Sequence, residues 1–245
     1  MIVEIVLNSF GGQLLALEAC HGWDMTKTIQ INECVVFSKT KEAFGGFSNM
    51  SMEYPLEVNG MVFPTSEHFY QCMKYVDHPE VQREILGERN PLLMKNKQKK
   101  HRELIRKDWE DLKEIIMEVT VHLKLVTHWV KFGNLLMESG TKEIVERSKK
   151  DSFWGMIPQV SNPDLLVGEN KLGLILSRFR ELIRTEGTRG ELVNWIPDSK
   201  FRIMFNGELS VGFRVPDKVQ QVGNRSFDYL LRRSAATRHE YALAA

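Results

Sequence analysis

The segment Pro64–Tyr70, with the sequence PTSEHFY, carries the clearest chemical signal in the chain. A proline followed by two hydroxyl residues predicts the end of an extended segment and the start of a helix. Glu67 then falls in the first turn, and Gln71 and Lys74 follow it at helical spacing, so an acid, an amide and a base share one face. An ordinary amphipathic helix with a favourable acidic first turn has the same pattern.

Further motifs occur in order along the chain: Gly45–Asn49 (GGFSN), Arg106–Glu110 (RKDWE), Asp151–Gly155 (DSFWG), and Asn170–Gly173 (NKLG) followed by Arg180. In this order and with this spacing the chain resembles the NADAR family, the YbiA-like N-glycosidases, over about residues 34–186. The resemblance implies that the active residues are a glutamate, a tryptophan and an aspartate. At the matching positions this chain has Glu67, Trp109 and Asp151.

The two carboxylates suit the chemistry that the resemblance implies. Cleavage of a bond between ribose C1′ and nitrogen builds positive charge on the sugar, which a carboxylate can stabilise while it activates water. A position in the first helical turn favours the ionised form of Glu67, as a base requires. Asp151 could orient water, bind a ribose hydroxyl or help to protonate the leaving nitrogen. Packing in the core explains Trp109 equally well, and Asp151 can be a simple turn residue.

A larger set of residues is predicted to bind the substrate: Phe47, Ser48, Asn49, Gln71, Lys74, Arg106, Trp154, Gly155 and Asn170. Phe47, Trp109 and Trp154 could stack on a flat base, although buried aromatic residues are more often structural. Ser48 and Asn49 could hydrogen-bond sugar or phosphate, or satisfy their own loop. The basic run Lys97–Lys107 could hold a phosphate or form a solvated face. Arg180 matches a family position, but it could simply pair with a neighbouring glutamate.

The predicted function is therefore hydrolysis of an N-glycosidic bond to ribose 5-phosphate or ADP-ribose, without a cofactor. One substrate type is a phosphoribosylated amino-pyrimidine of riboflavin biosynthesis, and the other is ADP-ribose on guanine in nucleic acid, as in repair or an antitoxin. A non-catalytic ADP-ribose-binding module is the alternative from another class. Family members carry a glycine-rich stretch where this chain has Met156–Glu169, so substrate preference transfers least well.

Composition excludes several other classes. A net charge of +1 argues against a protein that coats DNA, and three widely spaced cysteines suit neither a disulfide framework nor zinc. No metal-binding set, Rossmann motif, membrane-spanning run or signal peptide is expected, so a cytoplasmic protein is predicted. His68 points away from Glu67 around the helix and is expected to be structural.

The predicted fold class is α+β: a mainly helical domain with a small β-sheet, plus a β-rich C-terminal extension. A lead-in at residues 1–33 is expected to hold a strand at Ile2–Leu7 and a short helix at Leu14–Cys20. The domain spans 34–186, with a strand at Glu33–Ser38, a hairpin at Asn59-Gly60, and helices at 107–131 and 171–185. The extension at 187–245, of unknown role, has a second hairpin signal at Asn206-Gly207.

Overall fold

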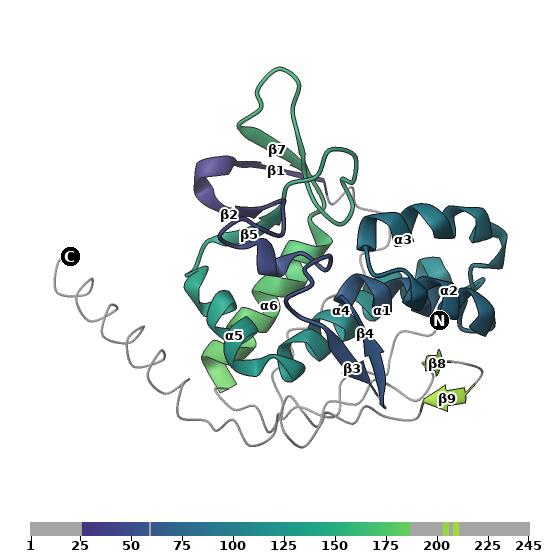
Figure 1. Ribbon diagram of the computed structural model, residues 1–245. Coiled ribbons are helices and arrows are strands. Elements are labelled where there is room, and N and C mark those ends of the chain that lie inside the picture. Colours follow the sequence, from purple (N-terminus) through teal and green to yellow (C-terminus); the bar gives the residue numbers. More distant parts are fainter. Residues whose placement is uncertain (1–25, 59, 187–202, 206–207, 211–245) are drawn as a thin grey trace, which may run out of the picture.

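The computed structural model describes residues 26–58, 60–186, 203–205 and 208–210 (Figure 1). The strand and helix expected at 2–7 and 14–20 lie outside these residues. The α-helices are α1 (Ser66–Cys72), α2 (Pro79–Gly87), α3 (Pro91–Lys97), α4 (Trp109–Thr127), α5 (Trp129–Glu138) and α6 (Lys171–Glu186). The 3-10 helices are η1 (Ile31–Glu33), η2 (Gly45–Phe47), η3 (Met73–Tyr75) and η4 (Gln98–Leu104).

The strands are short and divide into small groups. They are β1 (Lys27–Gln30), β2 (Cys34–Phe37), β3 (Leu56–Val58), β4 (Met61–Phe63), β5 (Glu143–Glu146), β6 (Ile157–Pro158), β7 (Leu165–Gly168), β8 (Ile203–Phe205) and β9 (Glu208–Ser210). An antiparallel sheet has the order β1-β7-β6, and β2 pairs in parallel with β5. The mainly helical α+β prediction for the domain is therefore confirmed.

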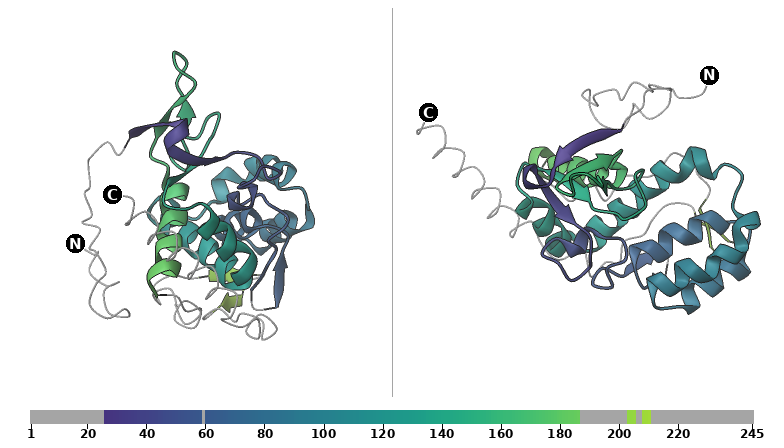
Figure 2. Two further views of the ribbon diagram at one scale, coloured as in Figure 1. Left: turned by 90° about the vertical axis from the view of Figure 1, so that its left-hand side faces the viewer. Right: turned by 90° about the horizontal axis from the view of Figure 1, so that it is seen from above.

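Helices α1, α4, α5 and α6 supply most of the main hydrophobic core. The inward positions predicted for the last helix, Leu172, Leu176, Phe179 and Ile183, are all buried in α6. Figure 2 shows that α2 and α3 project from one side of these helices, while the sheet of β1, β7 and β6 extends from another.

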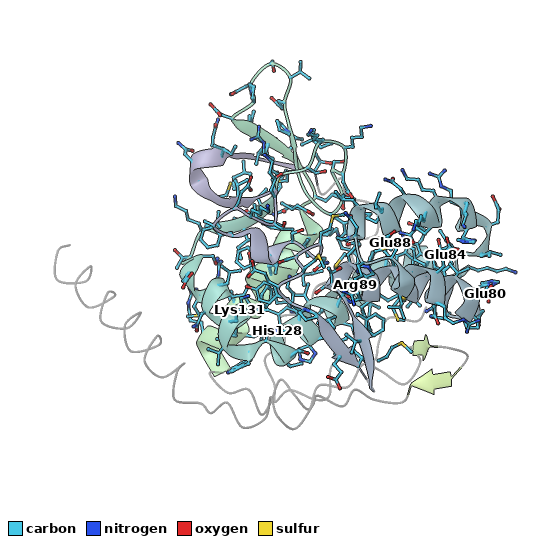
Figure 3. The ribbon with its side chains drawn as sticks, viewed as in Figure 1. Glu80, Glu84, Glu88, Arg89, His128 and Lys131 are labelled. Carbon is cyan, nitrogen blue, oxygen red and sulfur yellow. The ribbon has the colours of Figure 1, made fainter. Side chains whose placement is uncertain are left out.

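The long helix predicted at 107–131 is broken, which corrects that prediction. α4 ends at Thr127, and His128 leaves helical geometry with φ −115° and ψ 42°. The ring Nε2 of His128 lies 2.6 Å from the carbonyl oxygen of Pro55. The carbonyl of His128 accepts the first hydrogen bond of α5, from Phe132. The chain thus turns where His128 contacts Pro55, a residue distant in the sequence. The regular spacing of apolar residues along the helix contains no information about that contact. Figure 3 shows His128 at this turn, near Lys131.

Both hairpin signals coincide with paired strands. β3 and β4 pair in register Val58↔Met61, and Gly60 has the positive φ of +80° that such a tight turn requires. In the C-terminal extension, β8 and β9 pair in register Phe205↔Glu208. The remainder of the extension lies outside the described residues.

A second, smaller core joins the two strand groups. Cys34 and Val145 from the β2–β5 pair pack with Met156 and with Leu166 of β7. Ile29 of β1 packs against them, and Lys27 forms an ion pair with Glu143 of β5. Residues 27–30 of the predicted lead-in therefore belong structurally to this end of the domain.

Candidate active site

The N-terminus of α1 is fixed to the chain before it. Thr65 is the N-cap, and its side-chain oxygen accepts a hydrogen bond from the backbone N–H of His68, as the sequence predicts. The backbone N–H of Glu67 donates to the carbonyl of Asn49 at 2.9 Å, which joins the helix to the loop after η2. His68 has partners at both ring nitrogens, Thr65 Oγ1 at 2.8 Å and the Glu88 carbonyl at 2.7 Å, so its role is structural.

Glu67 is 6% exposed, and its carboxylate has one charged and one polar partner. Gln71 Nε2, one helical turn further on, donates to Glu67 Oε1 at 2.7 Å. Lys95 Nζ on α3 forms an ion pair with the same oxygen at 3.2 Å. Glu67 raises the pKa of Lys95, which keeps the ammonium group charged. This arrangement stabilises an ionised carboxylate at a largely buried position.

Tyr70 brings the two candidate tryptophans together. Its ring meets Trp109 edge to face, with centroids 5.1 Å apart, and Trp154 at 5.8 Å. Lys74 Nζ lies 5.1 Å from the centroid of the Trp109 ring, and burial lowers the pKa of this lysine. Trp109 itself is 8% exposed at the start of α4. The sequence interpretation did not select Tyr70, although it lies next to the helix positions that it did select.

Asp151 is exposed and has a structural role at one oxygen. Asp151 Oδ1 accepts hydrogen bonds from the backbone N–H groups of Phe153 and Trp154 at 3.1 and 2.9 Å. This is the turn geometry that the sequence left open as an alternative. It also fixes the start of the segment that carries Trp154.

Asp151 and Glu67 act on the same neighbouring groups. Burial has the largest effect on the pKa of Tyr70 and raises it, and the charges of Glu67 and Asp151 raise it further. Both carboxylates also raise the pKa of Lys95, with Glu67 the stronger. The two acids therefore act electrostatically on one region, although no contact joins them directly among the described residues.

Glu146 is a third carboxyl group in this region, and the sequence interpretation missed it. Burial, and then the charges of Glu67 and Asp151, raise its pKa from the ordinary value of 4.5 to about 7, although Lys95 opposes the shift. An acidic residue at the inward position that ends a buried strand, just before the Asp151–Gly155 motif, is the signal that could have found it.

Several predicted binding residues have structural surroundings instead. Phe47 is fully buried among Phe37, Phe44 and Phe132, so it offers no stacking surface at the molecular surface. Asn170 is also fully buried and adopts φ 55°, a conformation that asparagine tolerates. Its side chain donates to Ile144 and Glu143 and accepts from the backbone N–H of Glu146, which ties α6 to β5.

Gly155 and Arg106 also make supporting contacts. A Cβ at Gly155 would overlap the carbonyl oxygen of Glu146, so glycine lets the Trp154 segment approach β5. Arg106 pairs with Asp108 at 2.5 and 2.8 Å through two nitrogens. Its backbone N–H donates to the carbonyl of Lys74, which places it next to the aromatic group.

Lys124 binds the backbone of the loop that carries Ser48 and Asn49. This fully buried lysine on α4 donates to the carbonyl oxygens of Gly46 and Ser48 at 2.6 and 3.1 Å. Its ammonium group also lies 4.7 Å from the Phe132 ring centroid. Burial lowers the pKa of Lys124 to about 7. Asn49 Nδ2 contacts Met117 Sδ at 3.0 Å.

The basic run at 97–107 is largely paired. Glu80 and Glu84 lie in α2, and Glu88 comes directly after it (Figure 3). Lys97 pairs with Glu88 at 2.6 Å, while Lys100 and His101 pair with Glu84 at 2.8 and 2.9 Å. Arg180 donates to Ser139 and to the carbonyl of Lys142 and also pairs with Glu181, so it braces the turn before β5.

Among the described residues, no group of three or more His, Cys, Asp or Glu could hold a metal ion. No helix within the same residues has the length and apolar character needed to cross a membrane.

Comparison with known proteins places this site in context. A family model described as the NADAR domain matches residues 36–184. The chain is 30% identical over 150 residues to N-glycosidase YbiA of Shigella boydii, covering 61% of this chain and 88% of that protein. It is 36% identical over 163 residues to the chloroplastic riboflavin biosynthesis protein PYRR of Zea mays, covering 61% of this chain and 25% of that protein.

A solved structure is also similar. The NMR structure of the Escherichia coli protein YbiA superposes with a TM-score of 0.52 at 27% sequence identity. The similarity covers 63% of this chain and 88% of the other. The region matched by the NADAR family model, residues 36–184, begins before the η2 loop and reaches into α6. It therefore contains every side chain placed in the site.

Proposed function

The chain belongs to the NADAR family of N-glycosidases, and on that premise we propose that it hydrolyses the N-glycosidic bond between ribose 5-phosphate and an amino-pyrimidine. The name of the Zea mays relative, a riboflavin biosynthesis protein, favours this substrate class. The observation that carries the proposal is the buried, paired carboxylate of Glu67 beside the aromatic group of Tyr70, Trp109 and Trp154.

Glu67 is proposed as the base that activates water. Lys95 and Gln71 both contact Glu67 Oε1, and a carboxylate at this position can accept a proton from water and stabilise positive charge on the sugar. The second carboxylate, Asp151, is proposed to bind a sugar hydroxyl through its other oxygen, because Oδ1 is already engaged by the turn.

The aromatic residues are proposed to hold the base. The ring of Trp154 is partly exposed and is fixed by contacts with Tyr70 and with Phe153, whose centroid lies 4.9 Å away. The pyrimidine would stack here. Gln71 Oε1 and Asn49 Oδ1 are buried acceptors without a partner among the described residues. A substrate that brings N–H or O–H donors suits such acceptors.

The test is to incubate the protein with a phosphoribosylated amino-pyrimidine and, separately, with DNA that carries ADP-ribose on guanine. We expect release of ribose 5-phosphate from the first. Release of ADP-ribose alone would replace the proposed substrate class with the nucleic-acid one. Binding of ADP-ribose without turnover of either substrate would indicate a binding module.

The Glu67→Gln variant tests the role of the base. The amide keeps the shape and the contact with Gln71 but loses the negative charge, so we expect activity to fall by about 10²–10⁴-fold. Glu57→Gln, which removes an exposed charge on β3, is the matched control and should leave turnover unchanged. Turnover of Glu67→Gln close to that of the wild type would rule out this role.

A further inference from the structure

Glu146 occupies an inward-facing position at the end of β5. Side chains alternate between the two faces of a strand, so Glu146 shares a face with Ile144 and not with Val145. Ile144 belongs to the main core, which also contains Tyr70 and Trp109, whereas Val145 belongs to the smaller core. The carboxyl group of Glu146 therefore points toward the side of the strand where the aromatic group lies.

The backbone of Glu146 is fixed on both sides. Its N–H donates to Asn170 Oδ1 at 3.3 Å, and its carbonyl accepts from Met156 at 2.8 Å. A Cβ built on Gly155 would lie 3.2 Å from the Glu146 Cβ, so the segment that follows Trp154 passes directly against this residue. The backbone of Glu146 and the start of its side chain are thus fixed next to the segment that carries Trp154.

The carboxyl group itself has no structural partner. Within the described part of the chain it forms no ion pair and no hydrogen bond, in contrast to Glu143 on the same strand, which contacts Lys27 and Asn170. The charged groups that act on it are Glu67 from α1, Asp151 from the loop after β5, and Lys95 from α3. Burial raises the pKa of Glu146 most, Glu67 and Asp151 raise it further, and Lys95, which is paired with Glu67, opposes the rise.

We propose that Glu146 is a catalytic residue of this site, the acid that protonates the leaving nitrogen while Glu67 acts as the base. This inference rests on the proposed N-glycosidase function. Water gives a proton to Glu67, and its oxygen bonds to C1′ of the ribose. The C1′–N bond breaks with its electron pair on nitrogen, and Glu146 transfers its proton to that nitrogen. The products are the free sugar phosphate and the amine.

The surroundings support this division of roles between two carboxyl groups. A general acid must hold its proton at the working pH, and a site that contains carboxylates of opposite roles separates their pKa values. Burial together with two carboxylates raises the pKa of Glu146 to about 7, whereas Lys95 and Gln71 stabilise charge on Glu67.

The experiment compares the full-length wild type with Glu146→Gln and with Glu143→Gln, a control on the opposite face of the same strand. The rate of ribose 5-phosphate release from a phosphoribosylated amino-pyrimidine is measured as kcat/KM from acidic to alkaline pH. We expect the wild type to lose activity above about pH 7 as the acid ionises. Glu146→Gln should be slower by about 100-fold or more at neutral pH, and it should lack this alkaline decline. Glu143→Gln should retain both the rate and the decline.

A second measurement does not depend on turnover. Carbon-13 NMR of the glutamate carboxyl groups should show a titration near pH 7 in the wild type and in Glu143→Gln that is missing from Glu146→Gln. An active wild type with an unaltered Glu146→Gln rate and pH profile, or with no such titration, would overturn the role of Glu146 alone. A wild type that releases sugar phosphate from no substrate would overturn the proposed function, and the role of Glu146 with it.

Discussion

Glu67 and Glu146 are chemically identical groups in different electrostatic surroundings. Glu67 receives a lysine and an amide, while Glu146 receives two carboxylates and no partner among the described residues. Such a contrast between neighbouring carboxyl groups is typical of sites that need both an acid and a base. The contrast depends on residues of α1, α3 and β5. A change in any of these three segments should therefore alter the difference between the two carboxyl groups.

The raised pKa of Glu146 has a consequence for stability. Because the folded state binds this proton more tightly than the unfolded state, the contribution to folding is fully present below the ordinary pKa of 4.5 and is lost as pH rises through about 7. Glu146→Gln carries no charge at any pH, so at alkaline pH it should be more stable than the wild type by about 1–3 kcal/mol. At about pH 4 the two should unfold alike.

Thermal or urea unfolding at both pH values measures this effect. Glu143→Gln serves again as the control, because it removes a charge from the same strand at a position with an ion-pair partner. A Glu146→Gln variant that is less stable than the wild type at alkaline pH would contradict the buried, like-charged environment assigned to this residue.

At the scale of elements, local patterns predicted α1, α6 and both hairpins, but not the division between α4 and α5 or the contacts between elements. The start of α1 at Thr65–Ser66 and the inward face of α6 follow from local spacing. The break at His128 and the Lys95–Glu67 pair depend on residues distant in the sequence, which no periodicity contains. Phe47 shows the same limit, since an aromatic residue after two glycines fits a binding loop and a packed core equally well.

The contact between α4 and the η2 loop should depend on Lys124. Lys124→Met leaves one buried and one partly buried carbonyl oxygen without their donor, so we expect a loss of about 1–3 kcal/mol in the free energy of unfolding. The loop positions Glu67 through the carbonyl of Asn49, so activity should fall as well.

Lys131→Met is a matched control for this change. Lys131 lies 4.7 Å from the Tyr54 ring, close to the 4.9 Å of Lys124, but it is exposed and paired with Glu53 at the surface. Its loss should change stability by less than about 0.5 kcal/mol. Equal effects of the two variants in urea unfolding would show that the buried contacts of Lys124 do not hold the loop.

The junction between β5 and the Trp154 segment should depend on Gly155. In Gly155→Ala the new methyl group meets the Glu146 carbonyl, and the segment must move. Overpacking of this kind typically costs about 1–3 kcal/mol, and displaced Trp154 and Glu146 should reduce kcat/KM. Gly87→Ala, at the end of α2 with open space around it, should be neutral or slightly stabilising. Comparable losses in both variants would argue against this close approach.

At the scale of the whole molecule, the site is assembled from segments that span most of the domain. α1 supplies Glu67, α3 supplies Lys95, α4 supplies Trp109, and β5 with its following loop supplies Glu146 and Trp154. The described elements that pack into the two cores run from β1 to α6. The boundaries of the smallest active chain should therefore follow these packed elements, and not the 34–186 limits predicted from motifs.

A trimming series tests these boundaries. A chain of residues 26–189 contains every element from β1 to α6, so we expect it to fold and to retain N-glycosidase activity. A chain of residues 34–189 lacks β1, which removes four register pairs with β7, the packing of Ile29 and the Lys27–Glu143 ion pair. The shorter chain should lose about 2 kcal/mol or more, because apolar burial and strand hydrogen bonds are lost together. Equal unfolding midpoints for the two chains would place the domain boundary after β1, and an insoluble 26–189 chain would assign part of the extension to the core.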